Sequence, residues 1–207
     1  MKGSFTFYHV LSLAIVILLP ASGMVGIQDV GFAGFSVIYI FIFSKVVFPL
    51  THQPIEEKII DANSKVFVCY ITFGAITGLL LPILYMLNGI FEGGKEAIKD
   101  AAPHLFLLTC QILMEGVTFS GNFSLPIRVF VPVLFNSKRI FTLAEWLKKE
   151  AAKVDEDHGR LMGLVIFGLV LAAANMAFWC FNLFCFLLPV YLPRVFHKYY
   201  SAYKVAD

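Results

Sequence analysis

Charge is scarce in this chain. Only 14% of its 207 residues are Asp, Glu, Lys or Arg, and its formal net charge is +2, whereas soluble domains contain about 25% charged residues. So few charges cannot cover the surface of a water-soluble fold of this length, given the large apolar content. The low net charge also argues against a basic nucleic-acid-binding surface. We therefore expect no nucleic-acid partner and a solvent other than water for most of the chain.

Cysteine is also scarce, with four residues and no Cys-x-x-Cys pair. This excludes a disulfide-rich secreted module. The five histidines include no close pair that could share a metal, so we expect no metal site. The motifs of α/β-hydrolases, P-loop proteins, dinucleotide-binding folds and zinc proteases are absent from the sequence. We predict no cofactor and no enzymatic activity.

Apolar residues are what the chain has in abundance. They make up 59% of the sequence, including 22 Phe, and the mean hydropathy is +0.80. A lipid bilayer is the solvent that suits such a composition. The sequence therefore predicts a multi-pass integral membrane protein whose first partner is the lipid bilayer. Either the endomembrane system or the plasma membrane would be compatible with it.

Long runs with few charges divide the chain into membrane spans. A membrane helix needs about 20 mostly apolar residues, and five runs satisfy this requirement. The predicted fold class is all-α: a polytopic transmembrane helical bundle that occupies 1–207 as one domain, with one amphipathic surface helix. The predicted spans are 5–23, 31–50, 66–91, 101–120 and 161–191.

The first span has an alternative interpretation. Lys2 precedes its apolar core, and the small residues 21–23 follow it, as in a secretory signal peptide. Cleavage there would leave four spans. The orientation of every later loop would be unchanged, because the new terminus would emerge on the side already assigned to residues 24–29.

The segment 121–137 is apolar but short. Arg128 lies near its centre, and Pro126 and Pro132 remove backbone donors. We predict an interfacial or re-entrant segment. The distribution of basic residues supports this prediction, because Lys and Arg favour the cytoplasmic side of a membrane. Five spans place most of the Lys and Arg residues on the inner side, whereas a sixth span would leave a slight majority of them outside.

The next segment, 138–160, has the periodicity of an amphipathic helix. Apolar residues recur every three or four positions, and lysines occupy the other faces. Such a helix can lie on the cytoplasmic leaflet, where anionic lipid attracts Lys and Arg. A solvated helix packed against neighbouring loops is the alternative. The residues predicted to contact lipid are Trp146, Lys148, Lys149 and Lys153.

Polar residues inside a span are costly and are the first candidates for function. His104, Gln111 and Glu115 fall on one face of the fourth predicted span. One hypothesis is a proton or cation path in which Glu115 titrates. The favoured hypothesis places Glu115 near the inner interface, in an ion pair with Arg128 or Lys45.

Other polar and small residues in the spans suggest helix packing. Gly74 and Gly78 form a small-xxx-small pattern that allows two backbones to approach closely. Asn175 and Asn182 are seven residues apart, on nearly the same helix face, where each amide would bond to another helix. We predict a packing role for all four.

Several strings are similar to a known family. They are ASGMV at 21–25, MEGV at 114–117, LPIRVFVP at 125–132 and NMAFWCFN at 175–182. Together they resemble an uncharacterised family of land-plant multi-pass membrane proteins, a domain of unknown function, over about 10–200. The resemblance implies a plant membrane protein. It supplies no activity, ligand or catalytic residue.

The sequence as a whole favours a non-enzymatic protein that organises the membrane or binds partners, either other membrane proteins or copies of itself. The alternative is a small transporter or channel subunit that uses the His104, Gln111 and Glu115 stripe. No paired repeats or matching broken helices support that alternative.

Overall fold

The structure is a computed structural model that describes residues 2–50, 64–92, 95–120, 123–156 and 162–206. The elements in this part of the chain are all helical, which confirms the predicted all-α fold class. Two of them, η1 and η2, are π-helical. In chain order the elements are α1 (Lys2–Ala21), α2 (Ile27–Val46), α3 (Lys65–Ala75), η1 (Ile76–Leu80), α4 (Leu81–Glu92), α5 (Lys95–Ser120), α6 (Leu125–Glu156), α7 (Met162–Phe181), η2 (Asn182–Tyr191) and α8 (Leu192–Ala206).

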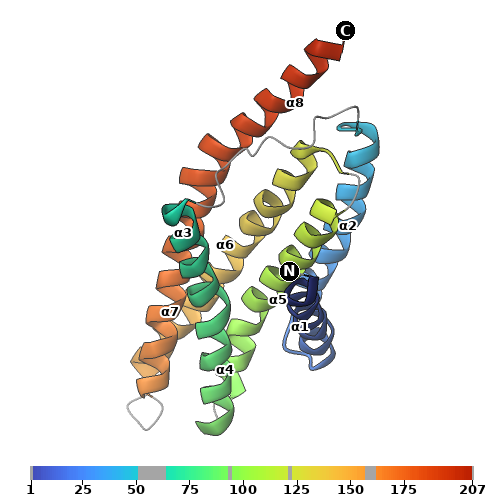
Figure 1. Cartoon of the computed structure of the whole chain (residues 1–207). Helices are drawn as coiled ribbons and strands as arrows, with labels where there is room; N and C mark the ends of the chain where they lie inside the picture. Colours follow the sequence, from blue (N-terminus) through green and yellow to red (C-terminus); the bar gives the residue numbers. More distant parts are fainter. Residues whose placement is uncertain (1, 51–63, 93–94, 121–122, 157–161, 207) are drawn as a thin grey trace.

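The helices form a bundle of long rods (Figure 1). α3, η1 and α4 follow one another as one rod, and α7, η2 and α8 form a second rod whose C-terminal end projects beyond the bundle. α5 and α6 lie side by side in the middle and contact most of the other helices. Many side chains on the facing sides of α5 and α6 are therefore buried.

Within the described ranges, four helical stretches are long and apolar enough to cross a membrane. They overlap the predicted spans 31–50, 66–91, 101–120 and 161–191. The first predicted span corresponds to α1, in which Ser12–Ala21 is a shorter apolar helix. These lengths and compositions are compatible with an integral membrane protein. The four stretches are Ile27–Val46, Lys65–Phe91, Ile98–Phe119 and Met162–Ser201.

The distribution of burial also suits a lipid surrounding. Large apolar side chains point outward, with Phe91 85%, Ile27 82% and Val66 79% exposed. Polar and charged side chains are fully buried in the interior, among them His104 and Arg139. In a membrane this arrangement is favourable, because polar groups face one another and apolar groups face lipid.

The π-helical turn η1 has a local cause in the sequence. Pro82 stands just after it in α4 and has no backbone N–H, so the carbonyl of Gly78, four residues earlier, loses its regular α-helical donor. A break of this kind leaves backbone oxygens free to accept bonds from neighbouring helices.

The structure differs from the prediction for the described part of 121–160, whereas 121–122 and 157–160 lie outside the described residues. Leu125–Glu156, which covers most of the predicted re-entrant segment and most of the predicted surface helix, forms one helix, α6, which packs against α5 and α7. Pro126 lies in the first turn, where proline is tolerated, and Pro132 removes only the donor for the Arg128 carbonyl. Arg139 is 0% and Trp146 is 1% exposed. The face of α6 that carries these two residues meets other helices.

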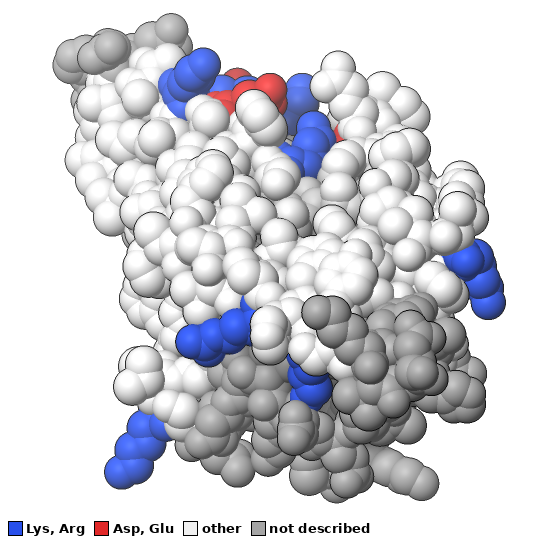
Figure 2. Space-filling model, turned by 90° about the horizontal axis from the view of Figure 1, so that it is seen from above, with Lys and Arg blue, Asp and Glu red and all other residues white. Residues whose placement is uncertain are grey.

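Charged side chains are thinly spread over the surface. Viewed from one end, the described residues are mostly uncharged, and the visible acidic side chains lie next to basic ones (Figure 2). The buried polar side chains described below lie in the interior, between α5 and α6.

Candidate functional site

Polar side chains run along the contact between α5 and α6, at spacings of three, four or seven residues on each helix. These spacings place each set on one helix face. We call this contact the α5–α6 seam. It contains Asp100, His104, Gln111 and Glu115 from α5, and Asn136, Arg139, Trp146, Glu150 and Lys153 from α6.

A chain of hydrogen bonds surrounds Arg139. One terminal nitrogen of its guanidinium donates to Oε1 of Gln111, and the other donates to Oδ1 of Asn136 at 2.8 Å. Nε2 of Gln111 in turn donates to Oε1 of Glu115 at 2.7 Å. The Gln111 amide thus bridges the guanidinium and the carboxylate. We call these four residues the Arg139 network.

A tryptophan connects this network to the π-helical turn η1. The Arg139 guanidinium carbon lies 4.2 Å from the centre of the Trp179 ring, a cation–π contact. Nε1 of Trp179 donates to Oδ1 of Asn175 at 3.2 Å, and Nδ2 of Asn175 donates to the Thr77 carbonyl at 2.9 Å. The polar interior therefore ties α6, α7 and η1 together.

His104 lies in the same seam, on α5, seven residues before Gln111. Its Nε2 lies 3.0 Å from the Gly78 carbonyl, which has lost its regular donor. Because a carbonyl can only accept, Nε2 carries the proton, and Nδ1 of a neutral imidazole is then an acceptor. The ring lies beside Trp146 and Trp179, with centres 6.1 and 6.4 Å away. Among the described residues no hydrogen bond links His104 to Gln111 or Glu115, so the predicted stripe has two separate parts.

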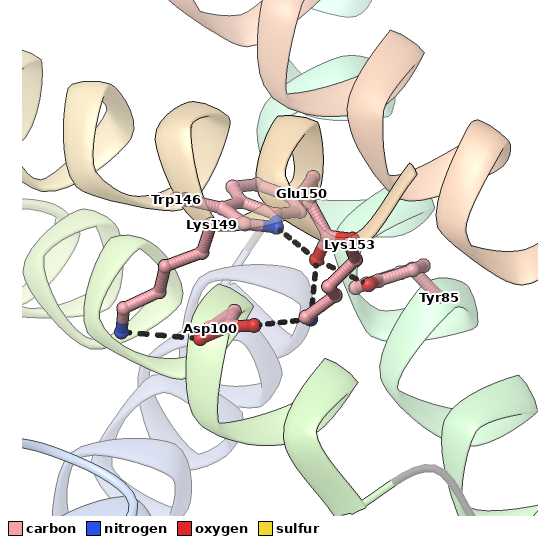
Figure 3. Close-up of polar contacts among 6 residues, drawn as sticks. All are labelled: Tyr85, Asp100, Trp146, Lys149, Glu150 and Lys153. Atoms are coloured by element: carbon pink, nitrogen blue, oxygen red, sulfur yellow. Dashed lines mark hydrogen bonds and ion pairs between the residues drawn. The ribbon is translucent and has the colours of Figure 1, made fainter. Parts of the chain in front are cut away.

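A second network forms around Glu150 (Figure 3). Oε1 of Glu150 accepts from the Tyr85 hydroxyl at 2.6 Å, from Nε1 of Trp146 at 3.1 Å and from Nζ of Lys153 at 3.2 Å. The Glu150 side chain is fully buried. Donors from α4 and α6 therefore converge on one carboxylate oxygen. We call these four residues the Glu150 network.

Asp100 extends the Glu150 network toward solvent. Its two carboxylate oxygens bind Nζ of Lys149 at 3.1 Å and Nζ of Lys153 at 2.5 Å. The ammonium of Lys153 is shared with Glu150, whose Oε1 lies 3.2 Å away. Lys153 therefore ties the end of α6 to the start of α5.

This pairing has a measurable chemical consequence. An amine must be free and accessible to react with an acylating reagent, and Lys153 is partly buried and held by the carboxylates of both Asp100 and Glu150. We expect Lys153 to be acylated several-fold more slowly than the exposed Lys148 on the same helix. Mass spectrometry of labelled peptides measures both rates, and equal rates would contradict the pairing.

The predicted partners of Glu115 need correction. Glu115 bonds to Gln111 and not to Arg128 or Lys45. Nε of Arg128 instead donates to the Phe123 carbonyl at 3.3 Å, and its guanidinium lies over the Phe119 ring. Lys45 is exposed near the end of α2. Gln111 lies one helical turn before Glu115 and reaches it directly, while Arg139 supplies the positive charge.

The predicted lipid-contact residues of α6 also need correction. Trp146 is buried, and its indole N–H donates to Glu150, so this side chain does not face lipid. Lys149 and Lys153 bind Asp100. Lys148 is exposed, and its contact with lipid stays a prediction.

The predicted packing residues all lie at contacts with another helix. A Cβ added to Gly74 would lie 2.8 Å from the Phe178 ring, and one added to Gly78 would lie 2.9 Å from Trp179. Asn175 bonds to the Thr77 carbonyl, and Asn182 accepts a hydrogen bond from the Tyr70 hydroxyl at 2.5 Å. These contacts join the α3–α4 rod to the α7–α8 rod.

Several residues of the site are not among those that the sequence predicts. A surface position for 138–160 gives Arg139 and Glu150 no partners inside the bundle, and no motif in the sequence marks Tyr85 or Asp100. The available signal was the spacing of 136, 139, 146, 150 and 153, which places five polar or amphipathic side chains on one face of a helix.

In the part of the chain that the structure describes, fold and seam together define a class: an all-helical protein with four helices of membrane-spanning length and a buried polar interior. The chain belongs to the family described as a domain of unknown function, DUF7733, whose model matches residues 3–200. This agrees with the resemblance to an uncharacterised family. No curated protein and no solved structure matches the chain.

Proposed function

We propose that this chain is a multi-pass integral membrane protein that organises the membrane or binds other membrane proteins. In this proposal α6 crosses the bilayer inside the bundle, together with the more apolar helices. One observation carries the proposal. The side chains capable of chemistry are largely buried and bonded to one another, whereas the outward faces are apolar.

The outward faces offer the contact surface. Phe73 on α3, and Phe181 and Phe184 at the junction of α7 and η2, are exposed. Aromatic side chains contribute strongly to contacts between proteins, because they bury a large area. In a bilayer such a surface can bind lipid or the apolar helices of a partner protein.

Photocrosslinking in native membranes tests the partner. A diazirine-bearing residue in place of the exposed Phe184 should give discrete crosslinked products with one or a few proteins, or with a second copy of the chain. The same residue in place of Phe135, which is fully buried, is the control and should crosslink only within the chain. Only lipid adducts at Phe184 would contradict partner binding.

A second candidate function is transport. The Arg139 and Glu150 networks place ionisable groups along much of the length of α5 and α6, which is unusual for a helix contact inside a membrane. We propose this as the alternative, with Glu115 as the titrating group. Proton or cation flux into vesicles containing purified protein should then exceed background and fall in Glu115→Gln. Background flux in both proteins would exclude this function.

A further inference from the structure

Aromatic side chains hold three segments together at one end of the bundle. Between ring centres, Phe48, just after the end of α2, lies 5.9 Å from Phe130 of α6. The same ring lies 5.5 Å from both Phe196 and Tyr199 of α8. The Ser124 hydroxyl, just before α6, donates to the Phe48 carbonyl at 2.8 Å. The end of α2, the start of α6 and α8 therefore meet at this end, the upper one in Figure 1.

Basic residues lie on each of the helices that meet here. Lys45 lies in the last turn of α2, Arg128 in the first turn of α6 and Arg194 in the first turn of α8. Lys65 is the first residue of α3, whose second turn contacts η2, the segment before α8. Three of these side chains are exposed and that of Arg128 is half-buried. We call Lys45, Lys65, Arg128 and Arg194 the basic end.

The basic end differs from the rest of the bundle in its lack of acidic partners. Elsewhere, Lys138 binds Asp29 at 2.9 Å and Lys153 binds Asp100 at 2.5 Å. Among the described residues, no carboxylate forms a salt bridge with the basic end. Apart from Glu115 in the Arg139 network, the described acidic residues lie at the start of α2, the end of α4, the start of α5 and the second half of α6. In Figure 2 several basic side chains stand apart from any acidic one.

The neighbouring sequence does not cancel this positive charge. The connection from α2 to α3, 51–63, lies outside the described residues and contains three acidic residues and Lys58. Lys198 adds a further basic residue on α8. With all of these included, basic residues still outnumber acidic ones around the basic end. This end of the bundle therefore attracts anions.

The basic end lies at the depth of lipid headgroups when the chain spans a membrane. Lys45 and Lys65 stand at the ends of two of the stretches of membrane-spanning length. Met162–Ser201 is longer, and at 1.5 Å per residue Arg194 lies about 48 Å from its first residue. A bilayer with its headgroups is about 40–45 Å thick. Long side chains at such positions extend their charged ends to the headgroups.

We propose that the basic end binds the headgroups of anionic phospholipids. Phosphate oxygens accept hydrogen bonds from ammonium and guanidinium groups, and a guanidinium can bind two of them at once. Headgroups surround membrane helices at this depth, so they reach basic side chains that come from four different helices. Anionic lipid adds a net negative charge that a zwitterionic lipid lacks. The inference rests on the proposed membrane location and not on partner binding at the aromatic outer faces.

Native mass spectrometry of the full chain in detergent tests this proposal, with phosphatidylserine or phosphatidylcholine as the added lipid. We expect the wild type to bind phosphatidylserine about tenfold more tightly than phosphatidylcholine, because each basic residue near the headgroups favours the anionic lipid. In Lys45→Gln/Arg194→Gln this preference should fall several-fold. Lys99→Gln/Lys148→Gln is the matched control, since it removes two exposed lysines outside the basic end, and the preference should be unchanged.

Equal affinities for the two lipids in the wild type would overturn the proposal. A preference that Lys45→Gln/Arg194→Gln lowers no more than the control does would also overturn it. Both double variants change exposed side chains only, so the buried networks stay intact and the fold is retained. Release of the chain from membranes by alkaline carbonate would instead contradict the proposed membrane location, so the two failures are distinguishable.

Discussion

Replacing Arg139 with methionine is expected to lower the free energy of unfolding by about 3–5 kcal/mol, the cost of removing one partner from a buried charge network. Methionine keeps much of the apolar volume but cannot donate to Gln111 or Asn136. It also loses the cation–π contact with Trp179. The Glu115 carboxylate then stays in the interior without the positive charge that balances it.

Reversible unfolding by denaturing detergent measures this loss. Lys148→Met is the matched control: it makes the same kind of change on the exposed side of the same helix and should alter stability by about 0.5 kcal/mol or less. In the double variant with Glu115→Gln the loss should be smaller than the sum of the single losses, because the unbalanced carboxylate is gone. Equal losses for Arg139→Met and Lys148→Met would contradict the network.

Gly168→Ala is expected to destabilise the protein by about 1–3 kcal/mol, the usual cost of overpacking a well-filled interior. The new Cβ would lie 2.6 Å from the Tyr85 hydroxyl oxygen and 2.8 Å from its ring. Tyr85 is buried and its hydroxyl binds Glu150, so it cannot move aside without breaking that bond. One added methyl group on α7 thus disturbs the Glu150 network on α6.

Gly34→Ala provides the control for this prediction. Gly34 also lies within a helix, but a Cβ at that position meets nothing within 4 Å. Alanine there should leave stability unchanged or raise it by up to about 1 kcal/mol, because alanine favours the helix more than glycine does. Thermal unfolding in the same detergent compares the two variants. A loss of the same size in both would show that packing against Tyr85 is not the cause.

Long uncharged runs made the helical fold predictable. Membrane-length helices follow from composition alone, since every backbone group bonds within its own helix, and four of the five predicted ranges overlap such helices. The α5 stripe was predictable for a similar reason, because Gln111 and Glu115 are four residues apart on one helix.

The position of α6 could not be predicted in the same way. Periodicity shows which face of a helix is polar but not whether that face meets water or polar groups of another helix. In α6 the side chains of Arg139 and Glu150 point inward, and Phe141, an apolar neighbour, is exposed. Gln111, which binds Arg139, and Tyr85, which binds Glu150, are distant from α6 in sequence. Only the tertiary structure therefore reveals that these buried charges have partners.

α6 is expected to cross the bilayer inside the bundle, with its polar face against α5. Epitopes inserted singly at 121–122 and at 157–161, before and after α6 in the chain, show on which side of the membrane each end of this helix lies. In sealed vesicles of defined orientation, antibodies added to one side should bind only one of the two epitopes. Accessibility of both epitopes from the same side would place α6 on the membrane surface and contradict a membrane-crossing α6.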